Sequence, residues 1–275
     1  MSFLVKSIFF TALIISILYF VFFNKRTLIA FTNKKVIIIG ATSGIGEALA
    51  KELAKRGALV GLTGRRKHLL EKISSEIPTR TFIKRMDIAQ AEQAQAQLKE
   101  LIGEMGGMDI LIINAAVGNC DLSWEKQKEI IDINVLGFTA MASVATDYFI
   151  RQGHGHLVGI SSLLAVRGSS AAPTYSASKA YVSNYLHGLR GRFMKLNKPI
   201  HVTTIEPGLV WTAMRGSCGA DREPSDFWRA TPQEAAQQIA DAIEQKRKHA
   251  YVTKRWRLIA WAMKLMPESL FYKLF

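Results

Sequence analysis

The sequence predicts an α/β fold in which one domain contains a doubly wound parallel sheet covered by helices on both faces. From Lys34 onward, short runs rich in Val and Ile alternate with amphipathic stretches of helical periodicity. This alternation is typical of repeated strand–helix units. The chain has 275 residues, is 49% hydrophobic and contains no Pro-, Gly- or Ser-rich linker. One substantial core is therefore expected rather than two domains.

The expected elements follow one another along the chain in regular order. Strands are predicted at 35–40, 58–64, 80–87, 108–116, 156–162 and 200–208. Helices are predicted at 44–57, 66–77, 93–107, 125–152, around Tyr175 and up to about Gln245. Strands that are joined through helices pair in parallel, because each helix returns the chain to the end of the sheet at which the strands begin.

The first strand-to-helix turn, "GATSGIG", contains Gly40, Gly44 and Gly46. Glycines at such a turn let the backbone approach a pyrophosphate, whose negative charge then lies at the positive end of the following helix. The alternative is an ordinary glycine-rich turn. The glycines directly follow a buried strand and precede a strong helix, which favours a nucleotide site.

The helix that begins "PTYSASKAYVSNYLHG" places Tyr175 and Lys179 four residues apart. Residues at this spacing share one helix face, so the phenol and the ammonium are expected to be neighbours. An adjacent ammonium favours the phenolate and lowers a phenol pKa from its usual value of about 10. The alternative is a surface tyrosine beside a solvated lysine.

Six separated motifs together resemble the short-chain dehydrogenase/reductase family from Lys34 to about Gln245. They are "GATSGIG", "INAAVG", "DINVLG", "GISSLLA", "YSASK" and "PGLVWT", with Ser162 thirteen residues before Tyr175. The sequence departs from the family pattern at Ile39, where Thr is usual, and at Ile113 and Ala116, which replace the outer Asn and the Gly of NNAG. The membrane-anchored steroid and lipid dehydrogenases and their bacterial relatives look nearest.

The resemblance implies a Rossmann-type fold and a carbonyl–alcohol oxidoreductase with a four-residue catalytic set. It implies that Tyr175 donates the proton, Ser162 hydrogen-bonds the substrate oxygen, Lys179 also binds the nicotinamide ribose, and Asn134 holds a water. The cofactor-binding residues that it implies are Gly40, Thr42, Ser43, Gly44, Ile45, Gly46, Arg65, Arg66, Asp87, Ile88, Asn114, Ala115, Tyr175, Lys179, Pro207, Gly208, Val210 and Thr212.

The turn after the second predicted strand reads "TGRRKH" and indicates which nicotinamide cofactor is bound. An acidic residue here would bind the adenosine ribose hydroxyl, whereas a basic residue would accept a 2′-phosphate. Arg65 and Arg66 stand at this turn without an acid. NADP(H) is therefore favoured over NAD(H); the alternative is two basic residues that simply open a helix.

The uncharged run Ser7–Phe23 is the candidate transmembrane segment, extended by Leu4, Val5 and a snorkelling Lys6 to spanning length. A cleaved signal peptide and a buried core helix are the alternatives, but the run ends in bulky aromatic residues without a small-residue cleavage pattern. The chain has 36 basic and 22 acidic residues, a net charge of +14, and the basic excess gathers at its two ends. The Lys/Arg flank after the run predicts a catalytic domain in the cytoplasm, and a membrane partner rather than nucleic acid.

The C-terminal segment 254–275 is predicted to be an amphipathic or hydrophobic helix that carries Trp and basic residues. Such a helix suits either a membrane interface or burial against the substrate pocket or a partner subunit. The expected organisation is an anchor at 1–30, a catalytic domain at 31–253 and this segment. A lipophilic substrate of steroid, retinoid, sphingoid or fatty-acyl type and a homodimer or homotetramer are expected; the alternative function is a catalytically silent, membrane-anchored nucleotide-binding or scaffold protein.

The two cysteines, Cys120 and Cys218, are far apart in the sequence. Their spacing matches no metal-binding or redox motif. The sequence therefore predicts neither a metal site nor a disulfide framework.

Overall fold

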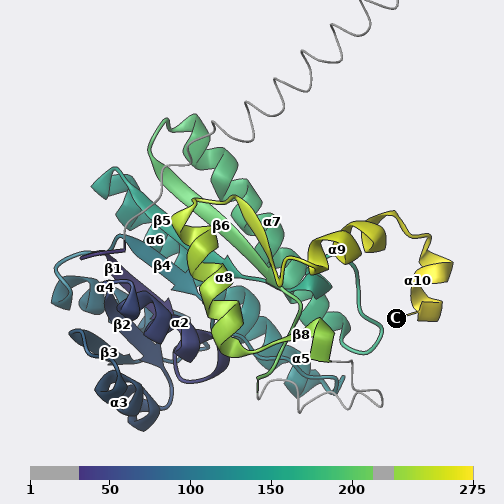
Figure 1. Ribbon diagram of the computed structural model, residues 1–275, viewed down its shortest axis with the longest axis horizontal. Coiled ribbons are helices and arrows are strands. Elements are labelled where there is room, and N and C mark those ends of the chain that lie inside the picture. The colour runs from purple at the N-terminus through teal and green to yellow at the C-terminus, as the bar shows by residue number, and fades with distance from the viewer. Residues whose placement is uncertain (1–30, 213–225, 275) are drawn as a thin grey trace, which may run out of the picture.

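Seven parallel strands form the central sheet of the computed structural model, which describes residues 31–212 and 226–274 (Figure 1). The strands are β1 (Lys35–Ile39), β2 (Leu59–Gly64), β3 (Thr81–Arg85), β4 (Ile110–Ile113), β5 (Gly155–Ile160), β6 (Ile200–Pro207) and β9 (His249–Val252). Their order in the sheet is β3-β2-β1-β4-β5-β6-β9. A second, two-stranded sheet pairs β7 (Leu209–Val210) with β8 (Arg229–Ala230).

The helices cover both faces of the sheet, as the doubly wound prediction requires. They are α2 (Gly44–Lys55), α3 (Lys67–Glu76), α4 (Ala91–Glu104), α5 (Trp124–Ile131), α6 (Phe138–Gln152), α7 (Pro173–Lys195), α8 (Pro232–Glu244), α9 (Trp256–Leu265) and α10 (Glu268–Leu274). One core cluster joins α2, α3 and α8 to the sheet, and a second joins α4, α6 and α7 to its other side. The middle strands are buried on both sides, which explains their near-continuous apolar runs.

The order of the strands reverses between β1 and β4, because the chain runs outward through β2 and β3 and then returns to the other side of β1. In such sheets the loops at the carboxyl ends of the two strands diverge and leave a crevice for a ligand. The glycine turn after β1 and the "INAAVG" segment after β4 both lie at this point. The topology therefore brings together two motifs that are about 70 residues apart in sequence.

Three features differ from the expected elements. The strands β7, β8 and β9 were not among the predicted strands. The C-terminal segment forms two helices, α9 and α10, rather than one, because Pro267 lies between them. The single predicted helix at 125–152 is continuous, but its middle, Asp132–Gly137 (η1), is a π-helical turn.

The proposed transmembrane segment Ser7–Phe23 lies outside the described residues. Within the described ranges, one helical stretch, Trp124–Gln152, is long and apolar enough to span a membrane, and 61% of its most apolar part is buried inside the protein. This stretch packs against the sheet in the second core cluster. This extent of burial is typical of a helix that packs in the core of a protein.

Candidate active site

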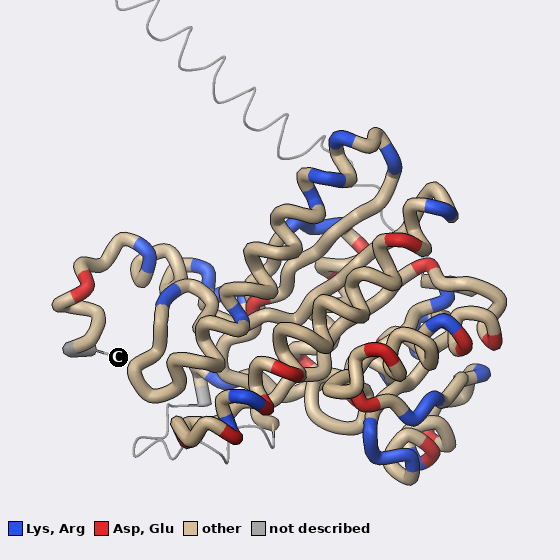
Figure 2. Tube along the Cα trace, turned by 180° about the vertical axis from the view of Figure 1, so that it is seen from behind, with Lys and Arg blue, Asp and Glu red and all other residues tan. Residues whose placement is uncertain are grey.

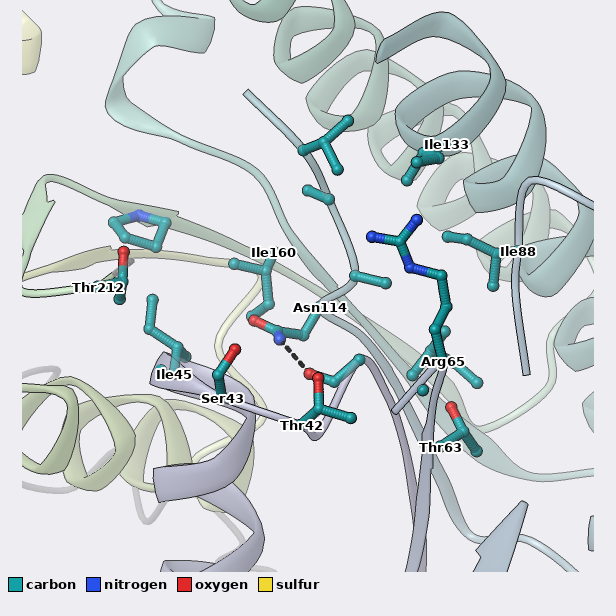
Figure 3. A pocket seen from close by; sticks show the side chains of 18 of the residues that line it. Thr42, Ser43, Ile45, Thr63, Arg65, Ile88, Asn114, Ile133, Ile160 and Thr212 are labelled. Atoms are coloured by element: carbon teal, nitrogen blue, oxygen red, sulfur yellow. Dashed lines mark hydrogen bonds between the residues drawn. The ribbon is translucent and has the colours of Figure 1, made fainter. Parts of the chain in front are cut away.

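A cavity of about 290 Å³ lies at the carboxyl ends of the strands, where the loops that follow β1 and β4 diverge. Figure 3 shows several of its side chains. The residues predicted to bind cofactor or act in catalysis line this cavity, with the exceptions of Gly46 and Asn134. Those that line it are Gly40, Thr42, Ser43, Gly44, Ile45, Arg65, Arg66, Asp87, Ile88, Asn114, Ala115, Ser162, Tyr175, Lys179, Pro207, Gly208, Val210 and Thr212.

The glycine turn is held too tightly against its neighbours to accept side chains at two positions. A Cβ on Gly40, whose φ is +88°, would lie 2.7 Å from the Cα of Ala115. A Cβ on Gly46 would lie 2.0 Å from the carbonyl oxygen of Gly40. The Nδ2 of Asn114 donates to the same oxygen at 2.7 Å and ties β4 to the turn.

The turn also leaves the start of α2 open toward the cavity. Ser43, the residue before the helix, makes no side-chain capping hydrogen bond. The first backbone N–H groups of a helix lack intrahelical partners and carry partial positive charge. The start of α2 lines the cavity through Gly44 and Ile45, and phosphate binding at this place stays a prediction.

Two arginines stand at the end of β2, where they border the cavity. The Nη2 of Arg66 donates to Thr42 Oγ1 at 2.8 Å and to Ser43 Oγ at 2.9 Å. Arg65 extends from the end of β2 into the pocket (Figure 3). Asp87 lines the same region, and its Oδ1 accepts a hydrogen bond from the backbone N–H of Ala89 at 3.1 Å.

Ser162, Tyr175 and Lys179 meet on the opposite wall of the cavity. The Oγ of Ser162 accepts from the backbone N–H of Leu164 at 3.1 Å, and the Ser162 side chain lies close enough to the Tyr175 phenol to favour its ionised form. The Nζ of Lys179 lies 5.7 Å from the centre of the Tyr175 ring and donates to the carbonyl oxygen of Ile160 at 3.0 Å. The helix spacing therefore places phenol and ammonium side by side, as predicted.

Burial changes the pKa of both groups. Loss of solvent lowers the pKa of Lys179 to about 8, because the charged ammonium is disfavoured. Loss of solvent also raises the pKa of Tyr175, and the Ser162 side chain opposes that rise. The prediction that the phenol pKa falls below its usual value is wrong for this structure, because burial outweighs the opposing effects.

Asn134 lies in the π-helical turn η1 and is 1% exposed. Its Oδ1 accepts from the N–H of Val117 at 2.9 Å, and its Nδ2 donates to the carbonyl oxygen of Val117 at 2.8 Å and to Ser178 Oγ at 3.0 Å. The side chain thus holds the loop after β4, whose Val117 lines the cavity. Its expected role as a water ligand stays a prediction.

The sequence analysis did not predict a hydrogen-bonded group next to Lys179, which consists of Ser161, Ser183 and Glu206. Ser161 Oγ donates to the carbonyl oxygen of Lys179 at 2.8 Å. Ser183 Oγ lies 2.8 Å from Ser161 Oγ and 2.9 Å from Glu206 Oε1. These contacts join β5, α7 and β6 next to the cavity. In the sequence, the one feature that pointed to this group was the pair of serines in "GISS".

Among residues 31–212 and 226–274, no group of three or more His, Cys, Asp or Glu side chains converges on a metal site. Cys120, in the loop after β4, is disulfide-bonded. The sequence analysis did not predict this bond, because cysteine spacing alone does not show which thiols the fold brings together.

A parallel doubly wound sheet, a glycine turn at a helix start and a Ser-Tyr-Lys group in one cavity define a dinucleotide-binding oxidoreductase. The profile of the short chain dehydrogenase family matches residues 34–223. The chain belongs to this family and is an oxidoreductase of the short-chain dehydrogenase type.

Relatives and solved structures agree with this assignment. An uncharacterised oxidoreductase of Myxococcus xanthus is 35% identical over 64% of this chain and 72% of its own length. One of Staphylococcus aureus is 31% identical over 81% of this chain and 96% of its own length.

Two crystal structures have the same fold and carry nicotinamide nucleotides. A short-chain dehydrogenase from Burkholderia phymatum in complex with NAD has a TM-score of 0.77 and 18% identity, covering 86% of this chain and 94% of its own. An alcohol dehydrogenase from Thermococcus sibiricus complexed with 5-hydroxy-NADP has a TM-score of 0.71 and 25% identity, covering 79% and 95%. The first likeness concerns the fold alone.

Proposed function

We propose that the protein interconverts a carbonyl and an alcohol on a lipophilic molecule with NADP(H) as cofactor. The observation that supports the reaction is the hydroxyl pair of Ser162 and Tyr175 beside Lys179, in the cavity that also contains the glycine turn. The residues fit a dinucleotide, because the glycine turn, the start of α2 and the two arginines after β2 line one cavity.

In the reductive direction a nicotinamide held in this cavity would supply a hydride to the carbonyl carbon, and the chain would supply the proton. Ser162 and Tyr175 both line the cavity, and each has a hydroxyl that can donate to the carbonyl oxygen as it gains charge. Tyr175 gives its proton to that oxygen, and the ammonium of Lys179 stabilises the phenolate that remains. With a pKa of about 8, Lys179 exchanges protons readily near neutral pH.

The preference for NADP(H) is supported by the basic end of β2. Arg65 and Arg66 line the cavity, and Arg66 already bonds the two hydroxyls of the turn. A guanidinium offers several donors in a fixed plane and suits a phosphate group. An additional 2′-phosphate would therefore gain charge-assisted hydrogen bonds that the ribose hydroxyl of NAD(H) does not.

Fluorescence titration of the protein with NADPH and NADH tests this preference. We expect tighter binding of NADPH, and a loss of about tenfold to a hundredfold in NADPH affinity in Arg65→Ala/Arg66→Ala, corresponding to charged hydrogen bonds of about 1.5–3 kcal/mol. Lys67→Ala, one residue further along, is the matched control. Equal affinities of the two cofactors, or unchanged NADPH affinity in the double variant, would refute the preference.

The lipophilic substrate class is supported by the surroundings of Ser162. The next residue, Leu163, belongs to an apolar cluster with Trp256, and Leu209 and Trp228 pack against this cluster. A substrate of steroid, retinoid, sphingoid or fatty-acyl type would bring apolar surface to match it. Untargeted lipid profiling of a deletion strain tests this class: accumulation limited to water-soluble metabolites would contradict it.

The same proposal places the protein at a membrane, with the segment Ser7–Phe23 as anchor and the catalytic domain in the cytoplasm. The support is the length of the uncharged run and the basic flank that follows it. Protease added to the cytoplasmic side of sealed vesicles should cleave the catalytic domain. Protection of that domain would overturn the orientation and leave the enzymatic proposal intact.

A further inference from the structure

Helix α9 (Trp256–Leu265) is apolar on two opposite faces. Its inner face buries Trp256, Ala260 and Met263 in the apolar cluster that includes Leu163, the residue after Ser162. A Cβ on Gly208 would lie 2.2 Å from the Nε1 of Trp256. The inner face is therefore part of the wall that supports the site.

The outer face of α9 carries Leu258, Trp261 and Leu265, which are 73%, 67% and 65% exposed. These residues stand at positions i, i+3 and i+7, so they share one side of the helix. Single exposed apolar residues are common, but three large ones gathered on one helical face mark an interaction surface. None of these three side chains takes part in the packing of the inner face.

Basic side chains accompany the outer face. Arg257 and Lys264 are exposed on α9, Lys254 is exposed just before it, and the helix contains no Asp or Glu. These three side chains form no ion pair within the part of the chain that the structure describes. Figure 2 shows the Lys and Arg positions of the C-terminal segment. A Trp beside Leu residues and cations is the composition that binds the interface of an anionic bilayer.

We propose that the outer face of α9, formed by Leu258, Trp261 and Leu265 with Arg257 and Lys264, docks on an anionic lipid bilayer. This docking is separate from the anchoring segment and does not depend on the reaction that the site performs. It would set the catalytic domain against the bilayer with α9 between the lipid and the apolar wall beside Ser162.

A second copy of the chain fits this face less well than a bilayer. Three side chains of this size bury at most a few hundred Å², whereas a standard interface buries about 800 Å² per partner. Two copies that met through this face would also bring their cationic flanks together, and like charges at close range are unfavourable. An anionic surface is complementary to the same cations.

Quenching of tryptophan fluorescence by brominated lipids tests the proposal on the full-length protein. The chain has 5 tryptophans, and none lies in the Ser7–Phe23 segment, so an inserted anchor contributes no signal. In vesicles rich in brominated phosphatidylglycerol we expect quenching that Trp261→Phe largely removes. The matched control is Trp124→Phe, because Trp124 is 66% exposed on α5 and lies outside the outer face.

Two further measurements separate lipid contact from self-association of the chain. Leu258→Ser/Leu265→Ser should reduce the quenching that depends on Trp261, and neutral vesicles or high salt should weaken it because the cationic contribution is screened. If Trp261→Phe and Trp124→Phe were quenched equally, the face would not contact lipid. If Trp261 were instead shielded only as protein concentration rises, the face would bind a second copy; either result overturns the proposal.

Discussion

Replacing Lys179 with Met should change how the stability of the fold depends on pH. Lys179 is 3% exposed, and burial lowers its pKa from 10.5 to about 8. A lysine with a lowered pKa in the folded state costs stability while it is charged. That cost is fully present below about pH 8, fades as pH rises above the folded pKa, and has gone above 10.5.

The size of the effect follows from the two pKa values. At about 1.4 kcal/mol per pKa unit, the charged lysine costs the fold about 3 kcal/mol at neutral pH. Most of this cost is relieved between about pH 7 and pH 9.5, so the wild-type protein should gain about 2 kcal/mol relative to Lys179→Met over that range. The loss of the hydrogen bond to Ile160 shifts the difference at a single pH but affects this change little.

Urea denaturation of both proteins at the two pH values measures the change, because the other titrating groups are common to both and cancel. Lys195→Met, at an exposed position of the same helix, controls for the introduction of methionine. A difference in free energy of unfolding that stayed constant with pH would refute the reasoning. It would mean that the ammonium keeps its ordinary pKa in the folded protein.

Three other changes test the site and the anchor. Tyr175→Phe should lower kcat by at least a hundredfold and leave cofactor affinity nearly unchanged, because it removes only the proton donor; single-turnover kinetics and cofactor titration check this, and a near-normal kcat would contradict the mechanism. Asn134→Ala should destabilise the fold by about 3 kcal/mol, because Val117 N–H and C=O lose their partners; the midpoint of thermal unfolding measures it, and an unchanged midpoint would count against the role. A chain that begins at Thr32 should be released from neutral vesicles in high salt, where docking through α9 is weakened, and should keep its cofactor affinity because every residue of the cavity lies downstream; sedimentation with vesicles measures the release, and binding equal to that of the full-length protein would contradict the role of the anchor.

The sequence predicted those parts of the fold and site that depend on local pattern. The buried strands β1 and β4 are continuous apolar runs, and the turn between β1 and α2 is recognisable by its glycines. Tyr175 and Lys179 meet because helix spacing alone brings them together. Each of these features depends on residues within a few positions of one another.

The features that the sequence did not predict depend on contacts between distant segments. Strand β9 has only four residues, and it forms because β6 offers a free edge to pair with. The contacts of Ser161 and Ser183 with Glu206 unite three elements. The raised pKa of Tyr175 has the same origin, because burial is set by the whole site and outweighs what a neighbouring lysine would suggest.

Gly46 does not line the cavity, yet its Cβ position falls 2.0 Å from the carbonyl oxygen of Gly40. In a survey of all single substitutions, Gly46 should therefore be as intolerant as Tyr175, but for a different reason. Variants at Gly46 would lose abundance in the cell, since helix and turn can no longer pack. Variants at Tyr175 would keep their abundance and lose turnover. Measuring abundance and turnover together would therefore separate residues that are needed for folding from residues that are needed for catalysis.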